Sequence, residues 1–109
     1  MEYDLDTVMK KIRQVFPERD ANEILACLEG YGTESFERER YRVFLAILKL
    51  CDEEKLSDPS HYVEAAKQDY RDVLAWAQYP NQMKFAEPGK SAQFVKLDEE
   101  QYRAWLDKA

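Results

Sequence analysis

The chain has 109 residues, 45% of them hydrophobic and 35% charged, which is the balance of one soluble globular domain with its own core. Its 22 acidic and 16 basic residues give a net charge of −6, which repels phosphate backbones and argues against general nucleic-acid binding. Only three glycines and four prolines are present, too few turn residues to connect many strands. We therefore expect long helices joined by short loops.

Caps and apolar stripes predict the first two helices. The first runs from Leu5 to Phe16 between an N-cap at Asp4 and the stop at Pro17. Its apolar stripe consists of Leu5, Val8, Met9, Ile12, Val15 and Phe16. The second starts at Asp20, where Asp20 and Glu23 have capping-box spacing, and ends at Gly30, the expected left-handed C-cap. It should bury Ile24, Leu25, Cys27 and Leu28.

The third predicted helix follows Gly32-Thr33, runs to about Cys51, and is apolar on almost every side. The apolar set is Phe36, Tyr41, Val43, Phe44, Leu45, Ala46, Ile47, Leu48, Leu50 and Cys51. Such a helix is typical of the centre of a bundle. Arg40 falls within this apolar surface, so its side chain either extends to solvent or forms an internal ion pair with Asp69 or Asp72.

The fourth predicted helix runs from Asp58 to Tyr79, with Pro59 in its first turn and Pro80 ending it. At about 100° per residue, one face is apolar and the opposite face is polar. The apolar face contains Tyr62, Val63, Ala66, Tyr70, Val73, Leu74 and Ala77. A third stripe between them holds Ala65, Asp69, Asp72 and Trp76. This stripe packs against another helix or meets a partner.

The rest of the chain predicts a segment without helical period and a short last helix. Residues 81–96 are expected to form a packed loop or a small extended pair. The last helix runs from Leu97 to Lys108, with Asp98 and Gln101 as its capping box. We expect Tyr102 and Trp105 to dock over Trp76. The predicted fold is all-α, a single domain over residues 1–109, with four main helices, a central third helix and a short C-terminal docking helix.

Few residues suggest chemistry. Cys27 and Cys51 lie in apolar helical patterns, which favours core packing over a redox pair. His61 is the only histidine, and neither a nucleophile elbow nor a glycine-rich phosphate loop is present. We predict no catalytic residue, no metal site and no cofactor.

Two acids keep an alternative open. Asp69 and Asp72, three residues apart on a predicted helix, could bind a divalent cation or act as an acid–base pair, helped by His61 or Arg71. Ion pairing within the domain, or plain solvation, is the ordinary interpretation of such a pair.

Two resemblances bear on function. The motif K-x-D-Y-R-D-V-L-A-W-A-x-Y-P (67–80), with the preceding YRVFLAILKL, resembles the signature of small uncharacterised bacterial helical proteins, which implies no known activity. Residues 8–51 faintly resemble a CUE/UBA-like ubiquitin-binding module through Phe16-Pro17, the apolar positions Ile24 and Leu28, and the late pair Leu48 and Leu50. The third helix is longer than in such modules, the loop before it has extra residues, and further elements follow.

These patterns together predict a small, non-enzymatic protein-interaction module, such as a regulator, adaptor or immunity-type factor. The candidate partner-binding residues are Asp69, Asp72, Trp76, Tyr79 and Trp105. We expect a cytoplasmic monomer or weak homodimer with a protein partner, no nucleic acid and no membrane. The start MEYDLD lacks a signal-peptide pattern, and no apolar run reaches the ~18–20 residues of a membrane span. The alternatives are an enzyme or metal-dependent factor using Asp69 and Asp72, and CUE/UBA-like ubiquitin-fold binding.

Overall fold

The computed structural model describes residues 3–33, 39–81 and 91–108. This part of the chain contains only helices as regular structure: α1 (Leu5–Val15), α2 (Ala21–Leu28), α3 (Arg40–Glu54), α4 (Ser60–Gln78) and α6 (Ser91–Asp107). The all-α prediction is confirmed. None of the helices described is long and apolar enough to cross a membrane.

Local capping explains where α1 and α2 begin. Asp4 accepts a hydrogen bond from the Thr7 backbone N–H at 2.8 Å, and Asp20 accepts one from Asn22 at 2.8 Å, as the caps predict. The predicted left-handed cap at Gly30 is wrong. Gly32 has the positive φ, 97°, because the turn that leads away from α2 extends two residues further.

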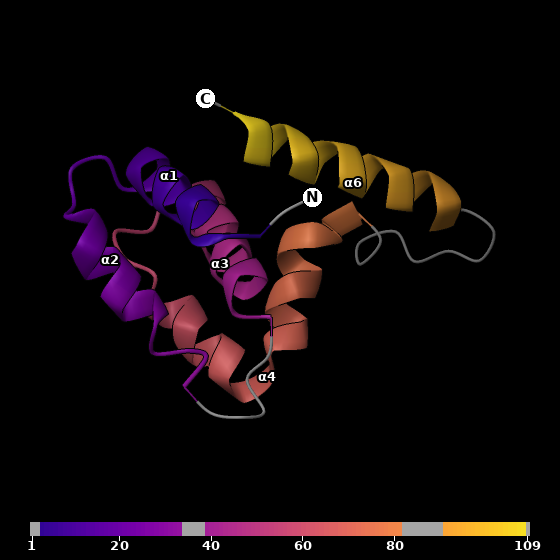
Figure 1. Cartoon of the computed structure of the whole chain (residues 1–109). Coiled ribbons are helices and arrows are strands. Elements are labelled where there is room, and N and C mark those ends of the chain that lie inside the picture. The colour runs from indigo at the N-terminus through magenta and orange to yellow at the C-terminus, as the bar shows by residue number, and fades with distance from the viewer. Residues whose placement is uncertain (1–2, 34–38, 82–90, 109) are drawn as a thin grey trace.

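The central helix is α3, as predicted: every residue from Val43 to Cys51 is buried. Figure 1 shows it in the middle of the molecule, and its main packing partners are α1 and α4. It begins at Arg40 rather than after Thr33, because Glu39 has the left-handed φ of 53° and no helix continues through it. Phe36 lies outside the described residues.

Of the two alternatives for Arg40, the structure shows the side chain that extends to solvent and not the internal ion pair with Asp69 or Asp72. Its guanidinium binds Glu29 at 2.9 Å, and both side chains are more than two-fifths exposed. The pair therefore lies at the surface, where the side chain extends to solvent.

The fourth helix is bent, which a regular 100° periodicity does not predict. Asp69 has extended backbone angles (φ −158°, ψ 103°) and separates two helical segments, 60–68 and 70–78. Figure 1 shows the two segments of α4 running in different directions. Asp69 Oδ1 accepts the Arg71 backbone N–H at 3.0 Å, which is N-cap geometry for the second segment. The predicted continuous stripe through Asp69, Asp72 and Trp76 is therefore wrong.

The bend also changes the surroundings of Trp76. Its ring lies edge-on to Tyr62 of the first segment, with centroids 6.4 Å apart, although 14 residues separate them. Trp76 stays 39% exposed. The predicted cover of Trp76 by Tyr102 and Trp105 is wrong, because the bend points this part of α4 toward its own first segment.

The last helix is longer than predicted and is held by polar contacts near its middle and at its C-terminal end. Six residues predicted as loop, 91–96, are helical. Asp98 does not cap the helix: it is 1% exposed and accepts hydrogen bonds from the backbone and side-chain nitrogens of Asn81 at 3.0 and 2.7 Å. The carboxylate that the local sequence predicts as a helix cap instead accepts hydrogen bonds from a residue 17 positions earlier in the chain.

Further along α6, Lys11 and Asp52 hold Trp105. The Lys11 ammonium, from α1, donates to the Trp105 and Lys108 carbonyls at the C-terminal end of α6, where carbonyls lack the usual donor of a further helical turn. It also lies 4.6 Å from the Trp105 ring centre, and the indole N–H donates to Asp52 of α3 at 2.9 Å. Lys11 is fully buried, and burial lowers the pKa of its ammonium.

The Asp69 cap gives the first prediction. Asp69→Ala removes the acceptor of the Arg71 N–H and should lower the urea midpoint of unfolding more than Asp72→Ala, because Asp72 is an exposed acid with no described hydrogen bond or ion pair. Asp69→Asn should retain most of the stability, since asparagine also caps. Equal effects of the two alanine changes would contradict the cap.

The pH dependence of that effect has a defined sign. Hydrogen bonds from the Arg71 side chain and backbone lower the pKa of Asp69 below its usual 3.8. The stabilisation is therefore present above the unfolded pKa and is lost as pH falls through the lower folded pKa. The difference between wild type and Asp69→Ala should shrink in acid-unfolding curves below about pH 4.

Candidate functional site

The best-formed hollow of the described surface lies between α3, α4, α6 and the start of the chain. It has a volume of about 500 Å³. Its lining consists of Tyr3, Arg42, Gln78, Tyr79, Lys96, Glu99, Glu100, Tyr102 and Arg103. We call it the tyrosine cleft. Three tyrosines supply its apolar surface, and no described aliphatic side chain lines it.

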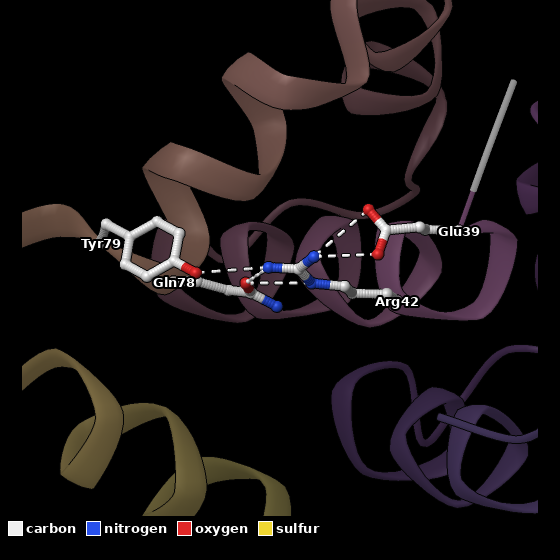
Figure 2. A network of polar contacts seen from close by, with 4 residues as sticks. All are labelled: Glu39, Arg42, Gln78 and Tyr79. Carbon is white, nitrogen blue, oxygen red and sulfur yellow. Dashed lines mark hydrogen bonds and ion pairs between the residues drawn. The ribbon is translucent and has the colours of Figure 1, made fainter. Parts of the chain in front are cut away.

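Arg42 of α3 organises one wall of the cleft, as Figure 2 shows. Its Nη1 donates to both carboxylate oxygens of Glu39, at 3.0 and 3.2 Å. Its Nε and Nη2 donate to Gln78 Oε1 at 3.2 and 2.7 Å, and Nη2 also reaches the Tyr79 hydroxyl at 3.3 Å. Burial alone would lower the pKa of Arg42, but Glu39 raises it above its usual value. The guanidinium stays charged, and its donors are in use.

The contact with Arg42 fixes the orientation of the Gln78 carboxamide. A guanidinium has only donors, so the amide oxygen must face it and the amide nitrogen must face away. Gln78 is 6% exposed, and its Nε2 makes no hydrogen bond with a described residue. In Figure 2 this nitrogen is the end of Gln78 that carries no dashed line. Gln78 Nε2 is therefore a buried donor in the wall of the cleft.

A second buried polar atom of the cleft is also unpaired. Tyr102 of α6 is 5% exposed, and its hydroxyl has no hydrogen-bond partner in the described part of the chain. Burial raises the pKa of Tyr102, and a polar interaction with the Gln78 side chain, which does not reach hydrogen-bond geometry, offsets only part of that rise. The phenol therefore keeps its proton across the usual pH range and can donate. Buried polar groups are nearly always paired, so two unpaired atoms in one cleft point to an occupant.

Exposed charges surround the mouth of the cleft. Lys96 and Arg103 face Glu99 and Glu100 on the same helix, two positive charges against two negative. The structure gives none of these four an ion pair within its described residues. A polar rim around aromatic surface is the usual composition of a protein-binding patch.

The candidate residues from the sequence separate into different places. Only Tyr79 lines the cleft. Asp69 forms a bidentate pair with Arg71, Oδ1 to Nε and Oδ2 to Nη2, both at 3.0 Å, while Asp72 is exposed without such a contact. Trp76 lies against Tyr62, and Trp105 against Lys11 and Asp52. The structure does not bring the five together.

The Asp69 contacts leave little room for the chemistry considered for the Asp69/Asp72 pair. Both Asp69 oxygens are occupied by Arg71, so metal binding or proton transfer would require breaking that pair. Within the described residues, no group of three His, Cys, Asp or Glu side chains is arranged to hold a metal ion.

The remaining residues with reactive side chains lie elsewhere. Cys27 and Cys51 are free thiols, and burial raises the pKa of both, that of Cys51 to about 12. Leu48 and Leu50, which carry the late part of the CUE/UBA-like resemblance, are 0% and 6% exposed. They serve the core and offer no surface to a ubiquitin-like partner in this conformation.

Sequence reasoning missed Gln78 and Tyr102 as a pair. Both were assigned by helix periodicity, one to a polar face and one to an apolar stripe. One feature of the sequence could have indicated the site. Gln78 and Tyr79 are adjacent polar-tipped residues at the end of a helix, just before Pro80, and the helix predicted to be central carries an arginine, Arg42, that could pair with them.

Comparisons with known proteins add no relative: no family model, curated protein or solved structure matches the chain.

The unpaired hydroxyl yields a stability prediction. Tyr102→Phe keeps the buried ring and removes a polar atom that lacks a partner, so the free energy of unfolding should be unchanged or rise by up to about 1–2 kcal/mol. Urea unfolding followed by circular dichroism measures it. As a comparison, Leu106→Ala removes buried apolar atoms from the same helix and should lower the free energy of unfolding by about 2–5 kcal/mol. A clear loss of stability in Tyr102→Phe would show that the hydroxyl is paired.

Proposed function

We propose that the protein is a small non-enzymatic binding module, and that a segment of a protein partner enters the tyrosine cleft. The observation that carries this proposal is the pair of buried, unpaired polar atoms, Gln78 Nε2 and Tyr102 Oη, in one tyrosine-lined hollow. Leaving such atoms unpaired costs stability, and proteins commonly accept that cost where binding requires it.

The composition of the cleft favours a protein partner over a small metabolite. Small-molecule pockets are lined mainly by apolar side chains with a few polar groups, whereas this lining has only tyrosine as apolar surface. Tyrosine and arginine are the residue types enriched at protein-binding hot spots. The net charge of −6 supports rapid association with a basic partner through electrostatic steering. Regulator, adaptor and immunity-type roles all fit such a module.

The test compares two aromatic residues near the end of α4. Purified tagged protein is incubated with extract of the source cells at low and high salt, as wild type, Tyr79→Ala and Trp76→Ala. Tyr79 lines the cleft, and Trp76 is exposed outside it. We expect a stoichiometric partner with wild type and Trp76→Ala, and at least about a tenfold loss with Tyr79→Ala.

Two results would contradict the proposal. One is a partner that is lost with Trp76→Ala and kept with Tyr79→Ala, which would move the binding site to the Trp76 and Tyr62 rings. The other is the absence of any stoichiometric partner at either salt concentration. Circular dichroism of both variants checks that the helices are intact.

A further inference from the structure

The inner wall of the tyrosine cleft presents two hydrogen-bond donors. Gln78 Nε2 can only donate, and its direction is fixed because Arg42 occupies the amide oxygen. The two hydrogen bonds from a cation also polarise the carboxamide and strengthen its N–H as a donor. The Tyr102 hydroxyl is the second donor, near enough for the Gln78 carboxamide to affect its titration. The complementary group is an acceptor oxygen, which has two lone pairs for two donors.

The charges around these donors indicate that the oxygen is uncharged. Arg42 is the only cation among the described residues that line the inner wall, and it is already paired with Glu39 and uses its N–H groups on Glu39, Gln78 and Tyr79. At the mouth, Lys96 and Arg103 are balanced by two glutamates. A carboxylate or phosphate at the inner wall would therefore lose its hydration without gaining a buried counter-ion, because Lys96 and Arg103 are exposed side chains at the mouth, and this loss is costly. A neutral carbonyl loses much less.

We infer that the tyrosine cleft recognises an uncharged amide carbonyl of the partner, from a peptide bond or an Asn or Gln side chain, which accepts hydrogen bonds from Gln78 Nε2 and Tyr102 Oη. This inference rests on the proposed binding function and names the group that the cleft selects. The tyrosine rings of the lining pack against the atoms that flank the carbonyl, and the rim contacts the rest of the segment.

A matched pair of probes tests the selectivity for an amide. Benzamide and benzoate have the same ring and differ in the amide and carboxylate groups. Each is titrated at equal ionic strength into ¹⁵N-labelled full-length protein, and the side-chain NH₂ signal of Gln78 is followed by NMR. We expect benzamide to shift this signal saturably, with an affinity at least about tenfold higher than that of benzoate.

Two variants test the donors. Gln78→Glu is nearly isosteric and keeps acceptor oxygens for Arg42, but it turns the cleft-facing donor into an acceptor. This variant should weaken benzamide binding at least about tenfold, and the binding is followed on the backbone NMR signal of Arg103. The loss of the side-chain NH₂ signal in the same variant also assigns that signal to Gln78. Tyr102→Phe should weaken benzamide binding about fivefold. Gln68→Glu, the same charge change at an exposed site on α4, should bind as wild type.

The possible outcomes separate the inference from the function on which it rests. Benzoate binding as tightly as benzamide, or more tightly, would overturn the amide selectivity. Shifts by neither probe, or full benzamide binding by Gln78→Glu with its helices intact, would also overturn it. In each of these cases the capture experiment with Tyr79→Ala and Trp76→Ala still decides whether the cleft binds a partner.

Discussion

The attachment of α6 to the other helices is the constraint on which the rest of the structure depends. Few apolar side chains hold this helix, since Tyr102 and Leu106 are its only buried ones in the described structure. Polar contacts fix the helix instead: Asn81 on Asp98 near its middle, and Lys11 with Asp52 on Trp105 near its C-terminal end. Hydrogen bonds require specific geometry, so they set the position of the helix more narrowly than apolar burial would.

That position creates the tyrosine cleft. One side of the cleft comes from Arg42 and Gln78 on α3 and α4, and the other from Tyr102 and its neighbours on α6. A small displacement of α6 would separate Tyr102 from Gln78, and the cleft would lose one of its sides. The buried ammonium of Lys11 has a similar role at a distance: it contributes nothing to the lining, yet it satisfies the carbonyls that end α6. The binding that we propose for the cleft therefore depends on the docking of the helix.

Local sequence rules predicted the parts of the fold that local interactions decide. The caps at Asp4 and Asp20 and the burial of the third helix follow from a few neighbouring residues, and the structure agrees. The capping rule could also have predicted the bend at Asp69. Asp69 and Asp72 have N-cap and N3 spacing, the same pattern that identified Asp20 and Glu23. Apolar periodicity continued through this position and suggested one long helix.

The candidate site depended on contacts that no local rule contains. Asp98 looks like a helix cap in sequence, but its partner, Asn81, is 17 residues away. Lys11 lies at the edge of the apolar stripe of α1, next to Ile12, and it is buried where the end of α6 lies against α1. Likewise, the role of Gln78 follows from Arg42, 36 residues earlier. The sequence predicted which segments are helices, but it did not predict which polar side chains pair between them.

Hydrogen exchange tests the central claim, that polar contacts at Asp98 and Trp105 position α6. Exchange is followed by mass spectrometry for wild type, Lys11→Met and the control Lys10→Met, which changes the adjacent exposed lysine. If the claim is correct, Lys11→Met speeds exchange across α6 and leaves α3 protected, while Lys10→Met matches wild type. Unchanged protection of α6 in Lys11→Met would contradict it.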